Sequence, residues 1–150
     1  MENSNTPSNI KDLVKAANDK TSWRRRLQAL NALKQLDCQQ SRDVIIRLAI
    51  HDRVYAVKQA AFLAAQALKL TKRGQPIRLG KKDIGFKSKD FKKVFLRIRR
   101  ETKMPELDLE LFKRTLKIIN PEMYDVMEYE KGAKFDEWIT NLYKSLPKNK

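Results

Sequence analysis

The sequence predicts an all-α protein. Apolar residues recur at intervals of three and four along most of the 150 residues, and no segment keeps the strict alternation of a β-strand. Only four Gly and five Pro interrupt these patterns, which leaves room for uninterrupted helices. Hydrophobic residues make up 41% of the chain, enough for a sizeable core, and we expect one compact body.

Helices are expected first over residues 10–18, 23–36 and 42–50, and then from Arg53 or Val54 to about residue 68. Asn9 and Ser22 are the residue types that cap helix N-termini, and they precede the first and second of these helices. Alanines crowd the fourth helix and would let its neighbours approach closely, with the remaining space filled by Val57, Leu63 and Leu68.

These four helices form an internal repeat with an offset of 31 residues, which aligns Leu13 with Val44 and Val14 with Ile45. A period near 30 made of two helices is typical of a stacked solenoid. The stretch 51–61, HDRVYAVKQAA, resembles the opening of a HEAT-like repeat, in which an Asp, a hydrophobic-basic pair and paired alanines begin the first helix. The earlier copy has Arg26 where Val57 stands, so either its register slips by one residue or the copy is degenerate.

The resemblance covers about residues 10–70. It implies a short right-handed α-α superhelix of the HEAT-like (armadillo) type, whose surface binds a partner. We expect a basic amphipathic helix and a C-terminal helical cap to continue it.

Positive charge is concentrated in the middle of the chain. Residues 69–103 hold fourteen Lys and Arg against three acids, so they carry +11 of the net charge of +15. Residues 71–87 contain Gly74, Pro76, Gly80 and Gly85 and predict a basic loop or a small hairpin. Ser88 is the expected cap of the next helix, whose packing stripe consists of Phe91, Val94, Phe95 and Ile98.

Three more helices are expected over residues 107–119, 120–131 and 135–146. The first carries apolar residues on two sides, with Leu107, Leu111 and Ile118 opposite the main stripe, which predicts a central helix. Asn120 and Pro121 form a typical helix start, and Gly132 a typical stop. Trp138 is the expected anchor of the last helix.

The expected organisation has five parts. Residues 1–9 are a disordered N-terminus, 10–70 the HEAT-like repeat pair, and 71–103 the basic loop and helix. Residues 104–146 form a C-terminal helical subdomain packed on the rest, and 147–150 a tail. No apolar run reaches the roughly 18 residues of a membrane helix. Together with Cys38, the only cysteine, this indicates a cytoplasmic protein.

Contact with nucleic-acid phosphates is the first function that this charge suggests. Cations on one side of a rigid helix can follow a row of phosphates and release counterions. Aromatic side chains are not interleaved among the cations, so we expect backbone contact without base reading. An ordinary solvated helix face, a membrane surface and an acidic protein partner remain alternatives. The expected contact residues are Lys81, Lys82, Lys89, Lys92, Lys93, Arg97 and Arg100.

A secondary basic surface on the repeat pair is a further possibility. Consecutive arginines on a helix point about 100° apart, so residues 24–26 cannot form one patch by themselves. The candidates are Arg24, Arg25, Arg42, Arg47 and Arg53.

Enzymatic signatures are weak, and we expect a non-catalytic protein without cofactor or metal. His51 is the only histidine, and Cys38 has no second cysteine beside it. Acidic residues cluster over 122–130, where helix-dipole and surface roles are favoured. Certain DNA glycosylases are built from HEAT-like repeats, which makes a pocket formed by Trp23, Asp52 and Tyr55 a remote alternative.

A protein-interaction adaptor is the main alternative to nucleic-acid binding. In that case the grooves of the repeat would take a partner helix or an acidic segment, and the charge would serve to steer the encounter. The sequence leaves DNA against RNA, sequence preference and oligomeric state open.

Overall fold

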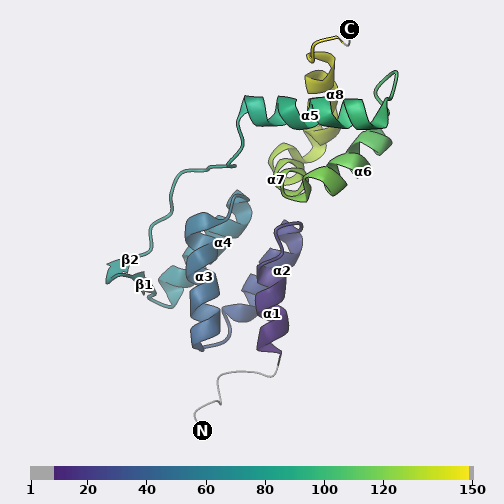
Figure 1. Ribbon diagram of the computed structural model, residues 1–150. Helices are drawn as coiled ribbons and strands as arrows, with labels where there is room; N and C mark the ends of the chain where they lie inside the picture. Colours follow the sequence, from purple (N-terminus) through teal and green to yellow (C-terminus); the bar gives the residue numbers. More distant parts are fainter. Residues whose placement is uncertain (1–8, 149–150) are drawn as a thin grey trace. The chain divides into compact units, whose positions relative to one another are not determined.

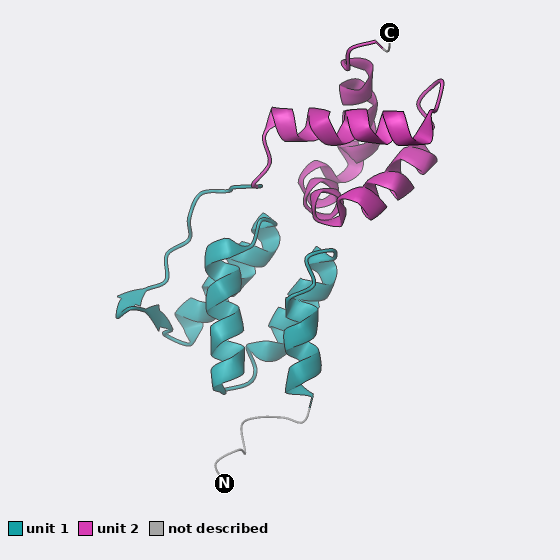
Figure 2. Cartoon of the chain, in the orientation of Figure 1, with its two compact units in different colours: residues 1–84 teal, residues 85–150 magenta. Residues whose placement is uncertain are grey.

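The computed structural model describes residues 9–148 and divides the chain into two compact units, 1–84 and 85–150 (Figures 1 and 2). One compact body was expected instead. The division also groups the basic helix with the C-terminal helices, whereas we had placed it with the basic loop. Residues 1–8 and 149–150, which hold most of the termini expected to be disordered, lie outside the described residues.

The all-α prediction is confirmed, because nearly every regular element in the described chain is a helix. The first unit contains α1 (Ile10–Ala17), α2 (Trp23–Leu33), α3 (Gln39–His51) and α4 (Tyr55–Ala67). Helix α1 packs against α2 and α3 against α4, while α1 also contacts α3 and α2 also contacts α4 (Figure 1). None of the helices in residues 9–148 combines the length and the apolar character that a membrane-spanning helix requires.

The core of the first unit comes from the predicted apolar stripes. Leu30 and Leu33 of α2 and Ile45 of α3 are fully buried, and small residues such as Ala61 and Ala65 let α4 approach its neighbours. Val57 is also buried, but Leu63 and Leu68 are 55% and 37% exposed. The expectation that these two leucines fill the core was wrong, since no described neighbour covers Leu63 on α4 or Leu68 directly after it.

Of the two expected N-terminal caps in this unit, only Ser22 makes a side-chain capping hydrogen bond. Ser22 accepts a hydrogen bond from the Arg25 N–H at 3.1 Å, whereas Asn9 precedes α1 without a side-chain capping bond. At the end of α4, Lys69 adopts a left-handed φ of 55°, and the Leu70 N–H reaches back to the Ala65 carbonyl at 2.9 Å.

A small hairpin follows α4. Strand β1 (Thr71–Lys72) pairs antiparallel with β2 (Gln75–Pro76) across Arg73 and Gly74, whose φ angles of 53° and 78° are those of a tight two-residue turn. From there an extended segment leads to the second unit (Figure 1). Of the loop or hairpin expected over residues 71–87, the hairpin is present over 71–76, and residues 77–87 form no helix or strand.

The second unit contains α5 (Ser88–Thr102), α6 (Leu109–Ile119), α7 (Pro121–Lys131), the 3-10 turn η2 (Gly132–Lys134) and α8 (Phe135–Lys144). Aromatic rings in edge-to-face contact fill its core. The Phe95 ring lies 4.6 Å from that of Phe112 and 5.6 Å from that of Trp138, measured between centroids. Trp138 also meets Phe91 at 5.2 Å, which confirms it as the anchor of α8.

Two expectations for this unit were wrong. Helix α5 begins after Lys87 and is capped by Asp90, whose carboxylate accepts the Lys87 N–H at 2.8 Å, so Ser88 lies inside the helix. Helix α6 is not central, because only Phe112 and Leu116 are buried while Ile118 is 81% exposed. The other two residues of its second stripe, Leu107 and Leu111, are only half-buried. Asn120 does cap α7, accepting the Met123 N–H at 3.1 Å.

Candidate functional site

Helix α5 is the element that presents most of the candidate contact residues. Its rotation about its own axis is fixed by three buried side chains, Phe91, Phe95 and Ile98. Because successive residues turn by about 100°, this buried stripe determines which residues face away from the core. Lys103, with φ 51°, ends the helix in a left-handed conformation, and its N–H donates to the Arg99 carbonyl at 3.0 Å.

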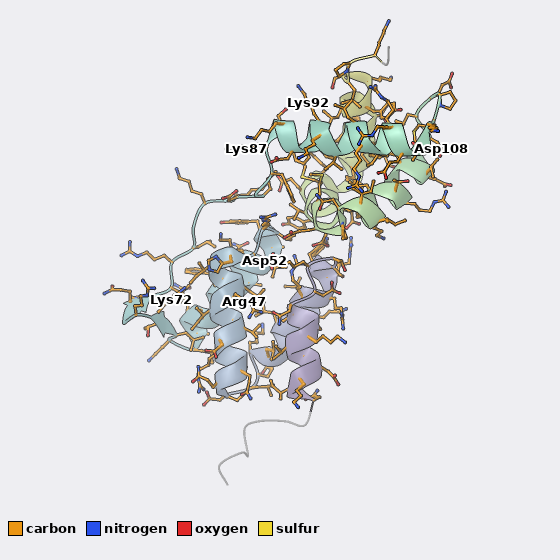
Figure 3. The ribbon with its side chains drawn as sticks, viewed as in Figure 1. Arg47, Asp52, Lys72, Lys87, Lys92 and Asp108 are labelled. Carbon is orange, nitrogen blue, oxygen red and sulfur yellow. The ribbon has the colours of Figure 1, made fainter. Side chains whose placement is uncertain are left out.

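Lys89, Lys93 and Arg100 lie opposite the buried stripe, and all three are exposed. Lys92 and Lys103, also exposed, and the half-buried Arg99 lie along the adjoining flank. We call these six residues the cationic face. None of the six side chains has an ion pair or a hydrogen bond to another residue of the described chain. Figure 3 shows Lys87 where α5 starts and Lys92 further along it.

Arg97 differs from the other predicted contacts on this helix. Its Nε donates to Glu101 Oε2 at 2.8 Å across one helical turn. By the same helical geometry, Arg97 shares the opposite flank with Asp90 and Glu101, where its charge is largely balanced. Arg97 is therefore the weakest of the predicted contacts on α5.

Two cations that were not among the expected contact residues lie at the C-terminal end of α5. Arg99 and Lys103 join Arg100 around a hollow of about 590 Å³ at the C-terminal end of α5, whose apolar side consists of Leu96, Met104 and Pro105. Three cations beside apolar side chains are suited to a ligand that has an anionic group attached to an apolar part. The spacing of Arg99 and Lys103 from Lys92, seven and eleven residues, could have placed them on one flank.

A second hollow, of about 420 Å³, lies over α6 and α7, with Glu110, Lys113, Arg114, Lys117 and Tyr124 around it. Its cations are partly engaged already. Lys113 Nζ donates to Asp136 at 2.8 Å, and this hydrogen bond raises the pKa of Lys113 above its usual 10.5. Lys117 Nζ lies 4.8 Å from the centroid of the Tyr124 ring. This hollow therefore presents less unengaged positive charge than the hollow at the end of α5.

Lys81 and Lys82 are exposed on the extended segment after the hairpin, in the first unit, whereas the cationic face belongs to the second. Their exposure is compatible with the predicted contact with a ligand, so Lys81 and Lys82 remain predicted contact residues.

The secondary basic residues are mostly held in local contacts. Arg25 pairs with Asp19 at 2.9 Å, Arg42 pairs with Asp37, and Arg47 donates to Asn18. The Arg24 guanidinium stacks 4.4 Å from the centroid of the Trp23 ring. Arg53 is half-buried. These contacts are compatible with a charged surface, but they leave less free charge here than on α5.

The residues of the remote glycosylase alternative do not form an open pocket. Both oxygens of Asp52 accept hydrogen bonds from Arg26, at 2.8 and 3.1 Å, and the Asp52 side chain is only 4% exposed. A general base at this position would have no access to a substrate.

Other candidates for chemistry are equally modest. Cys38 is buried at 5% exposure, and His51 lies exposed at the end of α3. Asp125, one of the clustered acids of α7, is itself buried. Across residues 9–148, no three His, Cys, Asp or Glu side chains lie close enough together to hold a metal ion.

Comparison with models of protein families, with curated proteins and with solved structures finds no match for this chain.

Proposed function

We propose that this protein is a non-catalytic module that contacts the phosphate backbone of nucleic acid through the cationic face of α5, assisted by Lys81 and Lys82. The observation that carries the proposal is the set of six cations on one side of a rigidly packed helix, without a counter-charge in the described chain. Unbalanced charge of one sign attracts a polyanion, and the release of its counterions drives binding.

The dimensions of the cationic face suit such a ligand. Lys89 and Arg100 are eleven residues apart, which at about 1.5 Å per residue is a row of roughly 16 Å. Phosphates of one strand advance about 3.4 Å per nucleotide along a duplex, so the row spans about five of them. The cations contact phosphates rather than bases, and the expected binding shows little sequence preference.

For the first unit we propose a HEAT-like repeat pair with the right-handed superhelical arrangement. Contacts between first helices, α1 with α3, and between second helices, α2 with α4, support this reading, as does the spacing of 32 residues between the N-caps Ser22 and Val54. That spacing favours the one-residue slip of register over a degenerate copy. We place the protein in the cytoplasm, where Cys38 stays reduced.

A protein-interaction adaptor is the second candidate. The exposed Leu63 of α4 and Leu68 directly after this helix favour it, since apolar side chains on a repeat surface can bind the apolar face of a partner helix.

The test is fluorescence anisotropy with labelled duplex DNA and single-stranded RNA over a range from about 50 to about 300 mM salt. The triple variant Lys89→Glu, Lys93→Glu, Arg100→Glu is compared with a control, Lys11→Glu, Lys20→Glu, Lys34→Glu, which has the same net charge but changes exposed lysines of the first unit.

We expect the α5 variant to lose about three units from the slope of log K against log salt and to bind at least a hundredfold more weakly, with a small effect in the control. Wild-type affinity that does not change with salt, or equal losses in the two variants, would contradict the proposal. Retention of a protein partner by the α5 variant, with loss on Leu63→Lys, would favour the adaptor.

A further inference from the structure

Lys58 is a buried cation without a counter-charge. It lies in α4 and is 8% exposed, one of four polar or charged residues buried in the described chain. Unlike Arg26, which the carboxylate of Asp52 neutralises, Lys58 has no hydrogen bond or ion pair to any residue among 9–148. Every fully buried side-chain nitrogen or oxygen in that range does have a partner. The Lys58 ammonium must therefore reach solvent through an opening.

Gly80 lies beside that opening. A Cβ placed on Gly80 would lie 3.9 Å from Lys58 Nζ and 4.0 Å from Cε, so the end of the lysine side chain passes directly under the glycine backbone. Both residues belong to the first unit. The buried Ile77, 8% exposed, fixes the extended segment to this unit three residues earlier.

The segment around Gly80 offers further donors. The backbone N–H groups of Gly80 and Lys81 donate to no other residue of the described chain. Arg78, Lys81 and Lys82 are exposed within two residues of Gly80 and add positive charge. A compact ammonium, two free amides and several cations make a combination that an oxyanion can satisfy at once.

The equivalent positions of α2 and α4 both hold a buried cation, but only the cation of α2 has a counter-charge. Arg26 is the fourth residue of α2, and Lys58 is the fourth residue of α4. The turn between α3 and α4 supplies the Asp52 carboxylate to Arg26. The chain that follows α4 instead brings Gly80, and no carboxylate, to Lys58. Burying an ammonium without a counter-charge is unfavourable, and a bound anion would offset that cost.

We infer that Lys58 and the segment Gly80–Lys82 form a binding site for a phosphate group. The inference deepens the proposed function and rests on it only for the source of the phosphate, since the backbone of a nucleic acid and free phosphate share this chemistry. Lys58 supplies the charge beneath the site, and the Gly80 backbone leaves the ammonium uncovered because it has no Cβ.

The experiment measures the unfolding of the full chain by Trp23 fluorescence in a Trp138→Phe background. Inorganic phosphate or pyrophosphate is added at constant ionic strength in one arm, and a 5′-hydroxyl oligonucleotide in the other. A ligand that binds the folded state raises the unfolding midpoint in proportion to the logarithm of its concentration.

Three variants decide the outcome. Lys58→Met keeps the apolar stem and removes the charge. Gly80→Ala adds a methyl group over the ammonium at an ordinary contact distance, and Gly80 has no positive φ that alanine would strain. Lys72→Met, on the exposed hairpin (Figure 3), removes the same charge elsewhere and is the matched control.

We expect Lys58→Met and Gly80→Ala to weaken the apparent affinity for the probe at least tenfold, with Lys72→Met within about twofold of wild type. A loss in the inorganic arm alone assigns the site to free phosphate, and a loss in both arms assigns it to a backbone phosphate as well. No stabilisation of wild type in either arm, or an equal loss in Lys72→Met, would overturn the inference.

The α5 triple variant separates this inference from the proposed function. If the phosphate site exists, this variant keeps its response to inorganic phosphate even where its affinity for nucleic acid is lost. Loss of the phosphate response in the α5 variant would overturn the site at Lys58 while leaving the function of α5 intact.

Discussion

Arg26 and Asp52 form a buried ion pair that joins α2 to the turn before α4. The Arg26 Nε donates to Asp52 Oδ2 at 2.8 Å, and the side chains are 6% and 4% exposed. A second Arg26 nitrogen donates to the Asp19 carbonyl at 2.8 Å, while Asp52 also accepts the Val54 N–H at 2.9 Å. One guanidinium of α2 thus connects the turn after α1 with the turn before α4.

Breaking this pair should destabilise the first unit strongly. Arg26→Ala leaves the Asp52 carboxylate buried without its counter-charge, and we expect a loss of about 3–5 kcal/mol in the free energy of unfolding. Urea unfolding followed by Trp23 fluorescence measures it. Arg25→Ala is the control, because the Arg25–Asp19 pair is exposed and should cost less than about 1 kcal/mol. Equal losses in the two variants would refute a structural role for the buried pair.

Asp19 should make the first unit sensitive to acid. Hydrogen bonds from Thr21 and Arg25 lower the pKa of Asp19 below its usual 3.8. The ionised carboxylate therefore contributes stability above pH 3.8, and this contribution disappears as the pH falls through the lowered pKa. We expect the difference in unfolding free energy between wild type and Asp19→Asn to be constant near neutral pH. It should shrink as the pH falls below 3.8. A difference that persists in strong acid would show that the ionisation of Asp19 contributes nothing.

Phe95 should be the most sensitive position of the second unit. Its side chain is fully buried against Phe112 and Trp138, and truncation to alanine is expected to cost about 3–5 kcal/mol. The effect should appear in unfolding curves followed by Trp138 fluorescence in a Trp23→Phe background. Ile118→Ala, at a position that is 81% exposed, should change little. If Ile118→Ala were as costly as Phe95→Ala, the assignment of the core would be wrong.

Cys38 offers an independent probe of opening in the first unit. Its thiol is 5% exposed, so reaction with a thiol reagent requires local or global unfolding. Arg26→Ala should accelerate labelling roughly a hundredfold or more, the factor that corresponds to its loss of stability. Phe95→Ala, in the other compact unit, should leave the rate near that of wild type. Fast labelling of the native wild-type protein would contradict the burial of Cys38.

Much of the helical structure could be predicted from the sequence. The apolar intervals located every helix to within a few residues, and Ser22, Asn120 and Trp138 have the expected roles. Such features depend on residues close together in the chain, where spacing and capping chemistry act directly.

Errors arose where the outcome depends on distant neighbours. Leu63 and Ile118 have the spacing of core residues, yet nothing in the described chain packs over them. In the candidate site, Arg97 was expected to contact a ligand but pairs with Glu101. Arg99 and Lys103 were not among the expected contacts, although they line the hollow beside Arg100.

The sequence by itself determined that this protein is helical and that its positive charge is concentrated in residues 69–103, because periodicity and composition are local properties of the chain. The tertiary structure decided which cations are balanced and which are not. Arg26 is neutralised by a carboxylate 26 positions away, and the Lys58 side chain lies beside a glycine instead. The six residues of the cationic face remain without a partner in the described chain. The net effect of a charge depends on burial and on neighbours in space, and only folding sets those.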